Sequence, residues 1–333
     1  LAAAIAAVAI HGVTLGPMSA GTGYTLMHQW LNRGGLAQRQ RAGGSGQLAA
    51  DLVAALKRDG GELRTGAAVQ RVRIEGQRAR GVVLAGGEEI AARSVLATAD
   101  PRHSLLDLVG APELPPEFVW QAQSIKLRGS VAKLHWLTDG SHGLPEGTLA
   151  VAPTIRYLER AFDAAKYGEL SAQPYLEITT RGNVVSAHFQ FAPFDLRQGD
   201  WEGTRAQLER IATDTLAAHA PSFANAVRQL RSITPADLQS TWGLTEGDLN
   251  HGQLILDQLF ILRPVAGWSA HATPIEGFYL GGSGTHGGGG ISGAAGRNAA
   301  RVILGAGAWS EPGAVRSPRP RTRCAPTGPR AVL

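Results

Sequence analysis

The sequence predicts a mixed α/β fold of about two domains. Three observations support this prediction. The chain has 333 residues, against roughly 150 for a typical domain. Short period-2 segments separated by glycines between residues 62 and 98 are typical of a small β-meander. A strand, a glycine-rich loop and a helix follow one another over residues 277–304, as they do in a parallel α/β sheet.

The charge distribution argues against a specific nucleic-acid partner. The net charge of +5 arises mainly in residues 310–333, which hold five arginines against one acid, Glu311, and the rest of the chain keeps about +1. A nearly neutral body offers no electrostatic surface for a phosphate backbone. We expect residues 306–333, rich in proline and arginine, to form a disordered basic tail.

The single cysteine, Cys324, excludes an internal disulfide and any cysteine-based metal site, and favours a reducing compartment such as the cytoplasm. Ten histidines show no metal-ligand spacing, so no metal is expected. The apolar residues 1–10 are too short to span a bilayer and lack the basic start of a signal peptide. Peripheral contact with a membrane stays open. Because the chain begins with Leu1, we expect that its natural start is missing.

The first half of the chain is expected to form three kinds of element. Residues 1–42 predict two helices around a turn at Gly16-Pro17, as a cap or partial domain. The glycines Gly43 and Gly44 then lead into a helix whose apolar residues repeat over 48–56. Residues 68–74, 79–84 and 89–98 predict the strands of the meander. A helix from Ser104 is expected to follow, so that residues 43–103 form one segment.

The second half is expected to contain another domain and then return to the first. Residues 104–272 mix strands and helices, with a hairpin over 175–191 that turns at Gly182-Asn183 and a helix over 204–217. Residues 273–305 predict a strand at 277–280, a loop at 281–290 and a final helix at 291–304.

The glycine loop is the most informative stretch, since glycines between a strand and a helix let backbone N–H groups approach an anionic ligand. Its Gly282-x-Gly284-x-x-Gly287 spacing lacks the further strand and acid of a dinucleotide-binding first turn. It therefore predicts the last strand and helix of a nucleotide-binding sheet, with a flexible linker as the alternative. His286 is interpreted either as a donor to the ligand or as an exposed loop histidine.

Two further patterns have simpler readings. The run from Gly290 to Ala294 is similar to a hydrolase nucleophile elbow, but no histidine follows it in the chain, so we interpret Ser292 as a helix N-cap. The apolar run 254–262 contains Asp257, and a buried acid needs a partner. We expect Asp257 to pair with Arg263, with contact to a substrate as the alternative.

Three stretches together resemble a known family: the Gly43-Gly44 loop, the strand end Thr98-Ala99-Asp100-Pro101, and the run from Leu256 to Ala300 that includes the glycine loop. The resemblance, over about residues 15–305, is to the phytoene-desaturase-like flavoprotein oxidoreductases, in the branch of pyridine nucleotide-disulfide oxidoreductase domain-containing protein 2. It implies the C-terminal portion of a two-domain, glutathione-reductase-like FAD-binding flavoprotein. The FAD domain would comprise 43–103 and 273–305, and 104–272 would be an inserted substrate domain.

The resemblance also implies an FAD site. Gly43 and Gly44 would lie near the flavin, Val69 would offer its backbone at the adenine end, and the glycine loop would line the ribityl chain and ring. Gly287 stands where the family usually has proline. The family's N-terminal strand, turn and helix for the ADP pyrophosphate have no counterpart in the sequence, so a partner chain could supply them. The implied site residues are Gly43, Gly44, Val69, Gly282, Ser283, Gly284, His286, Gly289, Gly290 and Ile291.

The function implied by this resemblance is that of an FAD-dependent oxidoreductase, similar to desaturases and dehydrogenases, that acts on a mostly apolar small molecule. The sequence names no catalytic acid or base and no electron acceptor. Two alternatives stay open: a non-catalytic interaction or scaffold protein that has lost FAD binding, and an amine-oxidase-like flavoenzyme.

Overall fold

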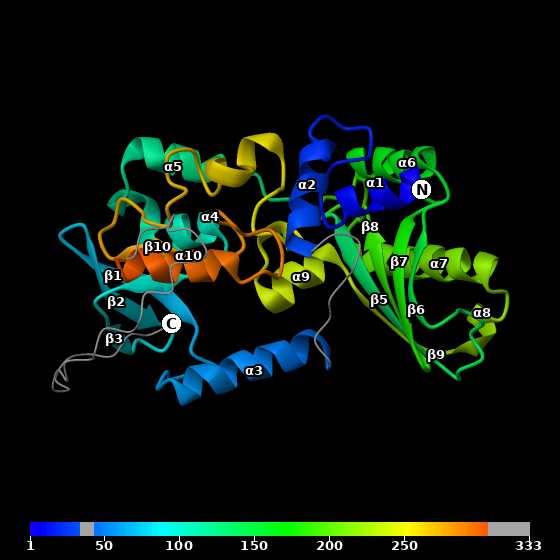
Figure 1. The fold of residues 1–333 in the computed structure, drawn as a ribbon, viewed down its shortest axis with the longest axis horizontal. Helices are drawn as coiled ribbons and strands as arrows, with labels where there is room; N and C mark the ends of the chain where they lie inside the picture. Colours follow the sequence, from blue (N-terminus) through cyan, green and yellow to red (C-terminus); the bar gives the residue numbers. More distant parts are fainter. Residues whose placement is uncertain (34–42, 306–333) are drawn as a thin grey trace. The chain divides into compact units, whose positions relative to one another are not determined.

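The computed structural model describes residues 1–33 and 43–305, and the expected tail, 306–333, lies outside the described residues. The described chain divides into two compact units. Unit 1 comprises residues 1–33 and 126–257, and unit 2 comprises 43–125 and 258–305. Each unit is therefore assembled from segments that are far apart in the sequence (Figure 1).

Unit 1 is an antiparallel sheet with helices. The five strands lie in the order β6-β7-β8-β5-β9. Strands β7 and β8 form a hairpin, which confirms the hairpin predicted to turn at Gly182-Asn183. The elements of unit 1 are α1 (Ala2–Ile10), α2 (Thr22–Arg33), β5 (Val131–Thr138), β6 (Gly147–Val151), α6 (Ile155–Lys166), β7 (Tyr175–Arg181), β8 (Val184–Gln190), α7 (Trp201–His219), α8 (Phe223–Ala226), β9 (Val227–Ile233) and α9 (Pro235–Trp242).

One face of this sheet carries the core of unit 1. Alternate residues of β5, such as Leu134 and Trp136, are fully buried there because successive side chains of a strand point to opposite faces. Helix α7 packs its Leu208 and Leu216 against them, and the Trp136 ring meets Phe223 of α8 edge-on, with ring centroids 5.5 Å apart. Because the side chains of β5 alternate, its remaining residues point to the opposite face of the sheet.

Unit 2 contains two small sheets. The three-stranded meander β1-β2-β3 is confirmed, and β4 pairs in parallel with β10. The elements of unit 2 are α3 (Gly44–Arg58), β1 (Val69–Glu75), β2 (Arg78–Leu84), β3 (Glu89–Ala91), β4 (Val95–Ala97), α4 (Pro101–His103), a π-helix (Ser104–Gly110), a 3₁₀ turn (Ala111–Glu113), α5 (Pro116–Gln123), a 3₁₀ turn (Phe260–Leu262), β10 (Phe278–Leu280) and α10 (Ala294–Ile303).

Several predicted boundaries in unit 2 are wrong by a few residues. The single strand predicted for 89–98 is two strands, because the chain leaves the meander after β3 and joins β10 through β4. The helix predicted from Ser104 begins at Pro101, where the Asp100 carboxylate caps it by accepting from the His103 N–H at 2.9 Å. The last helix begins at Ala294 with Gly293 as N-cap, so Ser292 is not the cap, although its hydroxyl accepts from the Ala294 N–H.

The division into units differs from the expected domains in two segments. Residues 104–125 and 258–272, which the sequence placed with the substrate domain, lie in unit 2. Both segments pack within that unit: the Phe118 ring of α5 contacts the Trp268 ring edge-on at 5.0 Å between centroids. Helix α3 is present as predicted, but none of its residues is buried.

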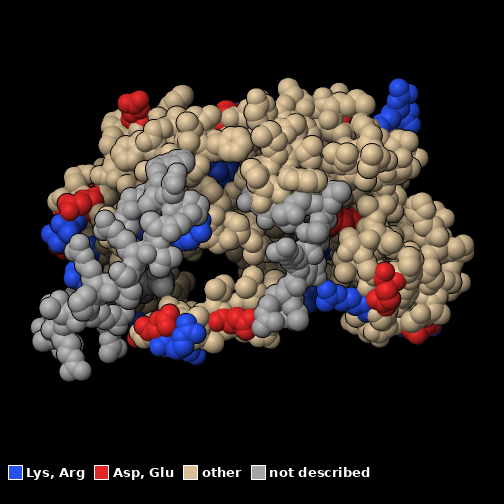
Figure 2. Space-filling model, in the orientation of Figure 1, with Lys and Arg blue, Asp and Glu red and all other residues tan. Residues whose placement is uncertain are grey.

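The surface of the described residues shows mixed charge. On the face drawn in Figure 2, basic and acidic residues are interspersed and much of the surface carries neither. No group of three or more His, Cys, Asp or Glu side chains suited to a metal ion occurs within residues 1–33 and 43–305. Within the same described ranges, no helix has the length and apolar character needed to cross a membrane.

Candidate functional site

The candidate site lies where β4 and β10 end. Because the two strands are parallel, their carboxyl ends lie at one edge, the place where α/β sheets bind ligands. The loop that follows β10 passes so close to the end of β4 that a Cβ on Gly282 would stand 2.1 Å from the Thr98 carbonyl oxygen. A Cβ on Gly281 would similarly meet the Leu96 side chain and Ala299 of α10. Glycine is thus required to hold loop, strand and helix together.

The glycine loop folds back on itself. The Thr285 N–H and hydroxyl both donate to the Gly282 carbonyl, at 3.1 and 2.8 Å. The Ser283 hydroxyl accepts from the Gly289 N–H at 3.1 Å. A Cβ on Gly288 would lie 2.1 Å from the Ser283 carbonyl oxygen. The loop is therefore an internally bonded structure, which does not fit the alternative of a flexible linker.

The buried side chain of Arg263 holds this loop by hydrogen bonds. Its side chain is 3% exposed, and its Nε and Nη2 donate to the Ser283 carbonyl at 3.1 and 3.0 Å. The predicted pair of Asp257 with Arg263 is wrong. Asp257 is exposed instead of buried, and its carboxylate lies 2.5 Å from Lys126 Nζ. The apolar run is itself broken by 3₁₀ turns, so its acid reaches solvent.

Two histidines contact the neighbourhood of the loop. The His286 Nδ1 lies 2.9 Å from the Phe260 carbonyl, so His286 has a structural contact and is not simply an exposed loop residue. His271 is 1% exposed, and its Nδ1 lies 2.9 Å from the Leu280 carbonyl at the end of β10. Burial lowers the pKa of the His271 imidazole, and the nearby His286 lowers it further, against the raising effect of the Leu280 carbonyl. A neutral His271 is therefore favoured at the base of the site.

The loop also presents backbone donors. Gly284 is buried, yet its N–H donates to no group among the described residues. The N–H groups of Gly290 and Ile291, on the exposed part of the loop before α10, likewise have no acceptor within the described chain. Buried backbone donors are nearly always bonded, so such a group points to a missing acceptor. The edge can thus receive the oxygens of a polar or anionic ligand.

The structure does not bring every predicted site residue into this loop. Gly43 is the N-cap of α3 and Gly44 its first residue, both with positive φ, +86° and +73°. Val69 begins β1 in the other sheet, where it pairs with Leu84. Among the described residues, no hydrogen bond joins any of these three to the glycine loop. Ile291 is in the loop, with an 85% exposed side chain, so only its backbone belongs to the site.

The sequence reasoning missed Thr98, His271 and the contact of Arg263 with the loop. The sequence marks Thr98 only as the end of a strand, because its closeness to Gly282 depends on the pairing of β4 with β10. No local pattern marks His271. The signal for Arg263 is its position directly after the apolar run 254–262 and before Pro264, but that signal suggests Asp257 as the partner instead of the glycine loop.

Comparison with known proteins gives a consistent family. The family described as "Flavin containing amine oxidoreductase" matches residues 7–304. The chain is 32% identical to pyridine nucleotide-disulfide oxidoreductase domain-containing protein 2 of Rattus norvegicus over 91% of this chain and 58% of that protein. It is 29% identical to a phytoene desaturase (lycopene-forming) of Paracoccus sp. over 86% of this chain and 59% of that protein. The chain thus spans less than two thirds of the length of these relatives.

Solved structures show the same fold at low identity. An oxidoreductase from Methanosarcina mazei matches with a TM-score of 0.54 and 13% identity, over 90% of this chain and 63% of that one. A putrescine oxidase bound to putrescine matches with a TM-score of 0.53 and 17% identity, over 90% and 64%. At these identities the likeness concerns the fold, which is that of FAD-dependent amine oxidases.

Proposed function

Because this chain belongs to the flavin-containing amine oxidoreductase family, we propose that it functions as part of an FAD-dependent oxidoreductase. In this proposal unit 2 binds the flavin and unit 1 binds the substrate. The main support for the proposal is the glycine loop at the carboxyl ends of β4 and β10, where the N–H of the buried residue Gly284 donates to no group among the described residues. This assignment of the two units corresponds to the two-domain, glutathione-reductase-like architecture that the family resemblance implies.

The donor set of the loop fits FAD. A flavin nucleotide presents phosphate, hydroxyl and carbonyl oxygens, which are acceptors for backbone N–H groups. The loop supplies such groups at Gly284, Gly290 and Ile291, and these residues would hold the cofactor. Ser283, Gly282 and Gly289 would act on the cofactor indirectly, by keeping the loop closed, as the bond from the Gly289 N–H to Ser283 Oγ does.

When bound, the flavin accepts electrons from a C–H or C–N bond of the substrate. The residues of this chain prepare the surroundings. Arg263 binds the Ser283 carbonyl with two donors, which helps to keep the loop in one conformation. His271, buried and favoured as the neutral form, adds no positive charge beneath β10. We assign no residue as catalytic acid or base.

We further propose a mostly apolar small-molecule substrate and an electron acceptor of unspecified class, without a specific nucleic-acid partner. The similarity to a phytoene desaturase supports the apolar preference. The single cysteine supports a cytoplasmic location, with peripheral membrane contact left open. The ADP end of the cofactor would require a strand, turn and helix from further sequence or from a partner chain.

The experiment is a titration of FAD into the full chain, in which flavin fluorescence reports the dissociation constant. Ile291→Pro removes one free backbone donor from an exposed position, and should weaken binding roughly tenfold if that donor reaches the cofactor. Ile291→Ala is the matched control, because it keeps the N–H and changes the same exposed side chain. Equal affinities of the two variants would reject this placement of the cofactor. Absence of any FAD binding would favour the scaffold alternative.

A further inference from the structure

The sheet of unit 1 has a second face, opposite to its core, that carries polar and charged side chains. On β5, His135 and Leu137 are exposed on this face, while Leu134 and Trp136 are buried on the other. The pairing of β8, β5 and β9 aligns three rows of side chains across it. The rows are Val184, Leu137 and Gln229; Ser186, His135 and Arg231; and His188, Lys133 and Ile233.

One end of this face is already bonded within the protein. His11, just after α1, stacks on His188 with 4.2 Å between ring centroids and reaches Glu177 at 3.3 Å. The two nitrogens of His188 lie 2.7 Å from Lys133 Nζ and 2.8 Å from Gln190 Oε1. The side chains at this end are therefore bonded to one another. The other two rows are the candidates for a ligand site.

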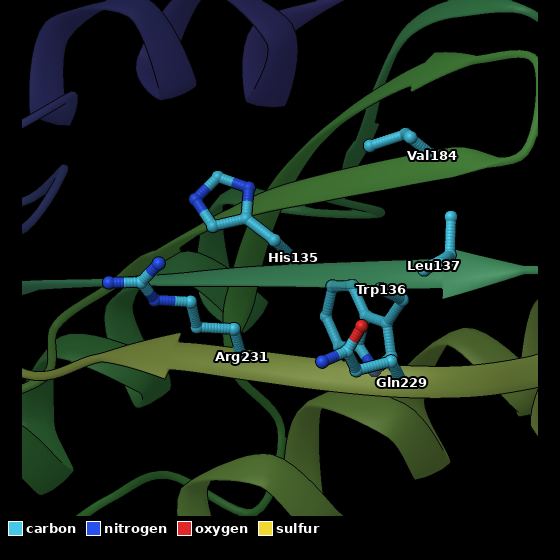
Figure 3. A pocket seen from close by; sticks show the side chains of 6 residues that line it. All are labelled: His135, Trp136, Leu137, Val184, Gln229 and Arg231. Atoms are coloured by element: carbon cyan, nitrogen blue, oxygen red, sulfur yellow. The ribbon is translucent and has the colours of Figure 1, made fainter.

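The other end is an open pocket of about 280 Å³. This volume is near the lower end of pockets that bind small molecules. Figure 3 shows His135 on β5 and Arg231 on β9 projecting to the same side of the sheet, with Leu137 and Val184 beside them. Leu137 and Val184 are each 41% exposed, so the pocket joins an apolar wall to a basic corner. Its lining residues are His135, Trp136, Leu137, Val184, Gln229 and Arg231.

The charge of the basic corner is not paired with an acid within residues 1–33 and 43–305. Arg231 makes no ion pair or hydrogen bond with any described residue, whereas Arg228 on the same strand is paired with Asp139. Partial desolvation of its ring against the sheet lowers the pKa of His135, and the positive charges of Lys133 and Arg231 lower it further. The pocket therefore has an excess of positive charge that a bound anion would offset.

His135 is also prepared as a donor. Its Nδ1 lies 2.8 Å from the Ser186 hydroxyl, which can donate to it. A neutral imidazole that accepts at Nδ1 carries its proton on Nε2. The Nε2 has no partner among residues 1–33 and 43–305. The pocket thus offers a neutral N–H from His135 beside the guanidinium fork of Arg231.

We propose that this pocket binds a small organic carboxylate, with the anionic group on Arg231 and His135 and a short apolar chain along Leu137 and Val184. The planar guanidinium matches a carboxylate in bidentate geometry. One unpaired arginine matches a single negative charge better than the nearly double charge of a phosphate ester. The inference rests on the proposed function, since it assigns an anionic end to the otherwise apolar substrate of unit 1.

The test is isothermal titration calorimetry on the full chain with four probes and no added FAD. Hexanoate has both charge and chain, hexanol the chain, acetate the charge, and inorganic phosphate a larger charge. Hexanoate should bind at least about tenfold more tightly than the other three, because only it uses both halves of the pocket. Equal binding of hexanol, tighter binding of phosphate, or no binding of hexanoate would overturn the proposal.

Variants locate the binding. Arg231→Gln should weaken hexanoate binding at least about tenfold. Arg228→Gln, the same change on the same strand but away from the pocket, should leave it unchanged, and thermal unfolding checks that both variants are folded. An unchanged affinity in Arg231→Gln would overturn the assignment. A parallel FAD titration separates the two claims: FAD binding without hexanoate binding rejects only the pocket, and the reverse rejects only the flavin function.

Discussion

Arg263 shows how one side chain can organise a whole loop. Its guanidinium is buried and donates to the carbonyls of Ser283 and Gln258. A buried charge is costly unless its hydrogen bonds are made, so the loop and the arginine depend on each other. The glycines permit the tight path of the loop, and Arg263 selects it.

Replacing Arg263 should therefore destabilise the protein. For Arg263→Gln we expect a loss of about 3 kcal/mol in the free energy of unfolding, because a charged donor and its bonds to Ser283 are lost. Urea unfolding measures it. Arg297→Gln, on the exposed side of α10, is the control and should change the free energy by less than about 0.5 kcal/mol. Similar effects of both variants would contradict the role given to Arg263.

His271 should make stability depend on pH. Its folded-state pKa is lowered, first by burial and then by His286, so the unfolded chain binds the proton more readily. Stability is therefore fully present above the unfolded value of about 6.5 and is lost as the pH falls through the folded value. His271→Asn keeps an amide donor and tolerates the positive φ of 66°, and should flatten this part of the profile. An unchanged slope between wild type and variant below pH 6.5 would show that another group titrates there.

The meeting of β4, β10 and α10 is the element on which the candidate site depends. For Gly282→Ala we expect a loss of about 3 kcal/mol, because the new Cβ would lie 2.1 Å from the Thr98 carbonyl. Gly296→Ala, where a Cβ would meet nothing within 4 Å, should be neutral or raise stability by up to about 1 kcal/mol. Thermal unfolding of the two variants checks both. A mild Gly282→Ala would mean that the loop does not pack on β4 this closely.

Elements bounded by glycine turns could be predicted from the sequence. The β7–β8 hairpin and the β1–β2 turn at Gly76 follow from local backbone requirements, which a sequence pattern reports directly. The division of residues 89–98 into β3 and β4 could not, because the two strands are only three residues each, lie close together in the sequence, and differ in their pairing partners. The apolar repeat of α3 likewise predicts a buried face, yet none of its residues is buried.

Both compact units are built from discontinuous segments of the chain. That residues 104–125 and 258–272 belong to unit 2 could not be predicted, because packing between distant segments leaves no local pattern. The same limit applies to the site. The glycine loop is continuous in sequence and was predicted as one motif, whereas Thr98, His271 and the contact of Arg263 with the loop depend on the tertiary fold.

Because the proposed cofactor binds unit 2 alone, its stabilising effect should be confined to that unit. Free FAD at 100 times its dissociation constant adds about 2.7 kcal/mol to the stability of what it binds. We expect hydrogen exchange in β1, β2 and β10 to slow with FAD, while β5 and β8 change little. Equal slowing in both units would indicate that they unfold together or that the cofactor is held by unit 1.

The most direct measurement is hydrogen exchange at the glycine loop itself, resolved by mass spectrometry with and without FAD. We expect exchange at Gly284, Gly290 and Ile291 to slow on FAD binding, because these N–H groups gain acceptors there that the described chain does not provide. Amides in the interior of α7 in unit 1, such as those of Leu208 and Ala212, should be unaffected. FAD binding with no change at the three loop amides would contradict the placement of the flavin on this loop.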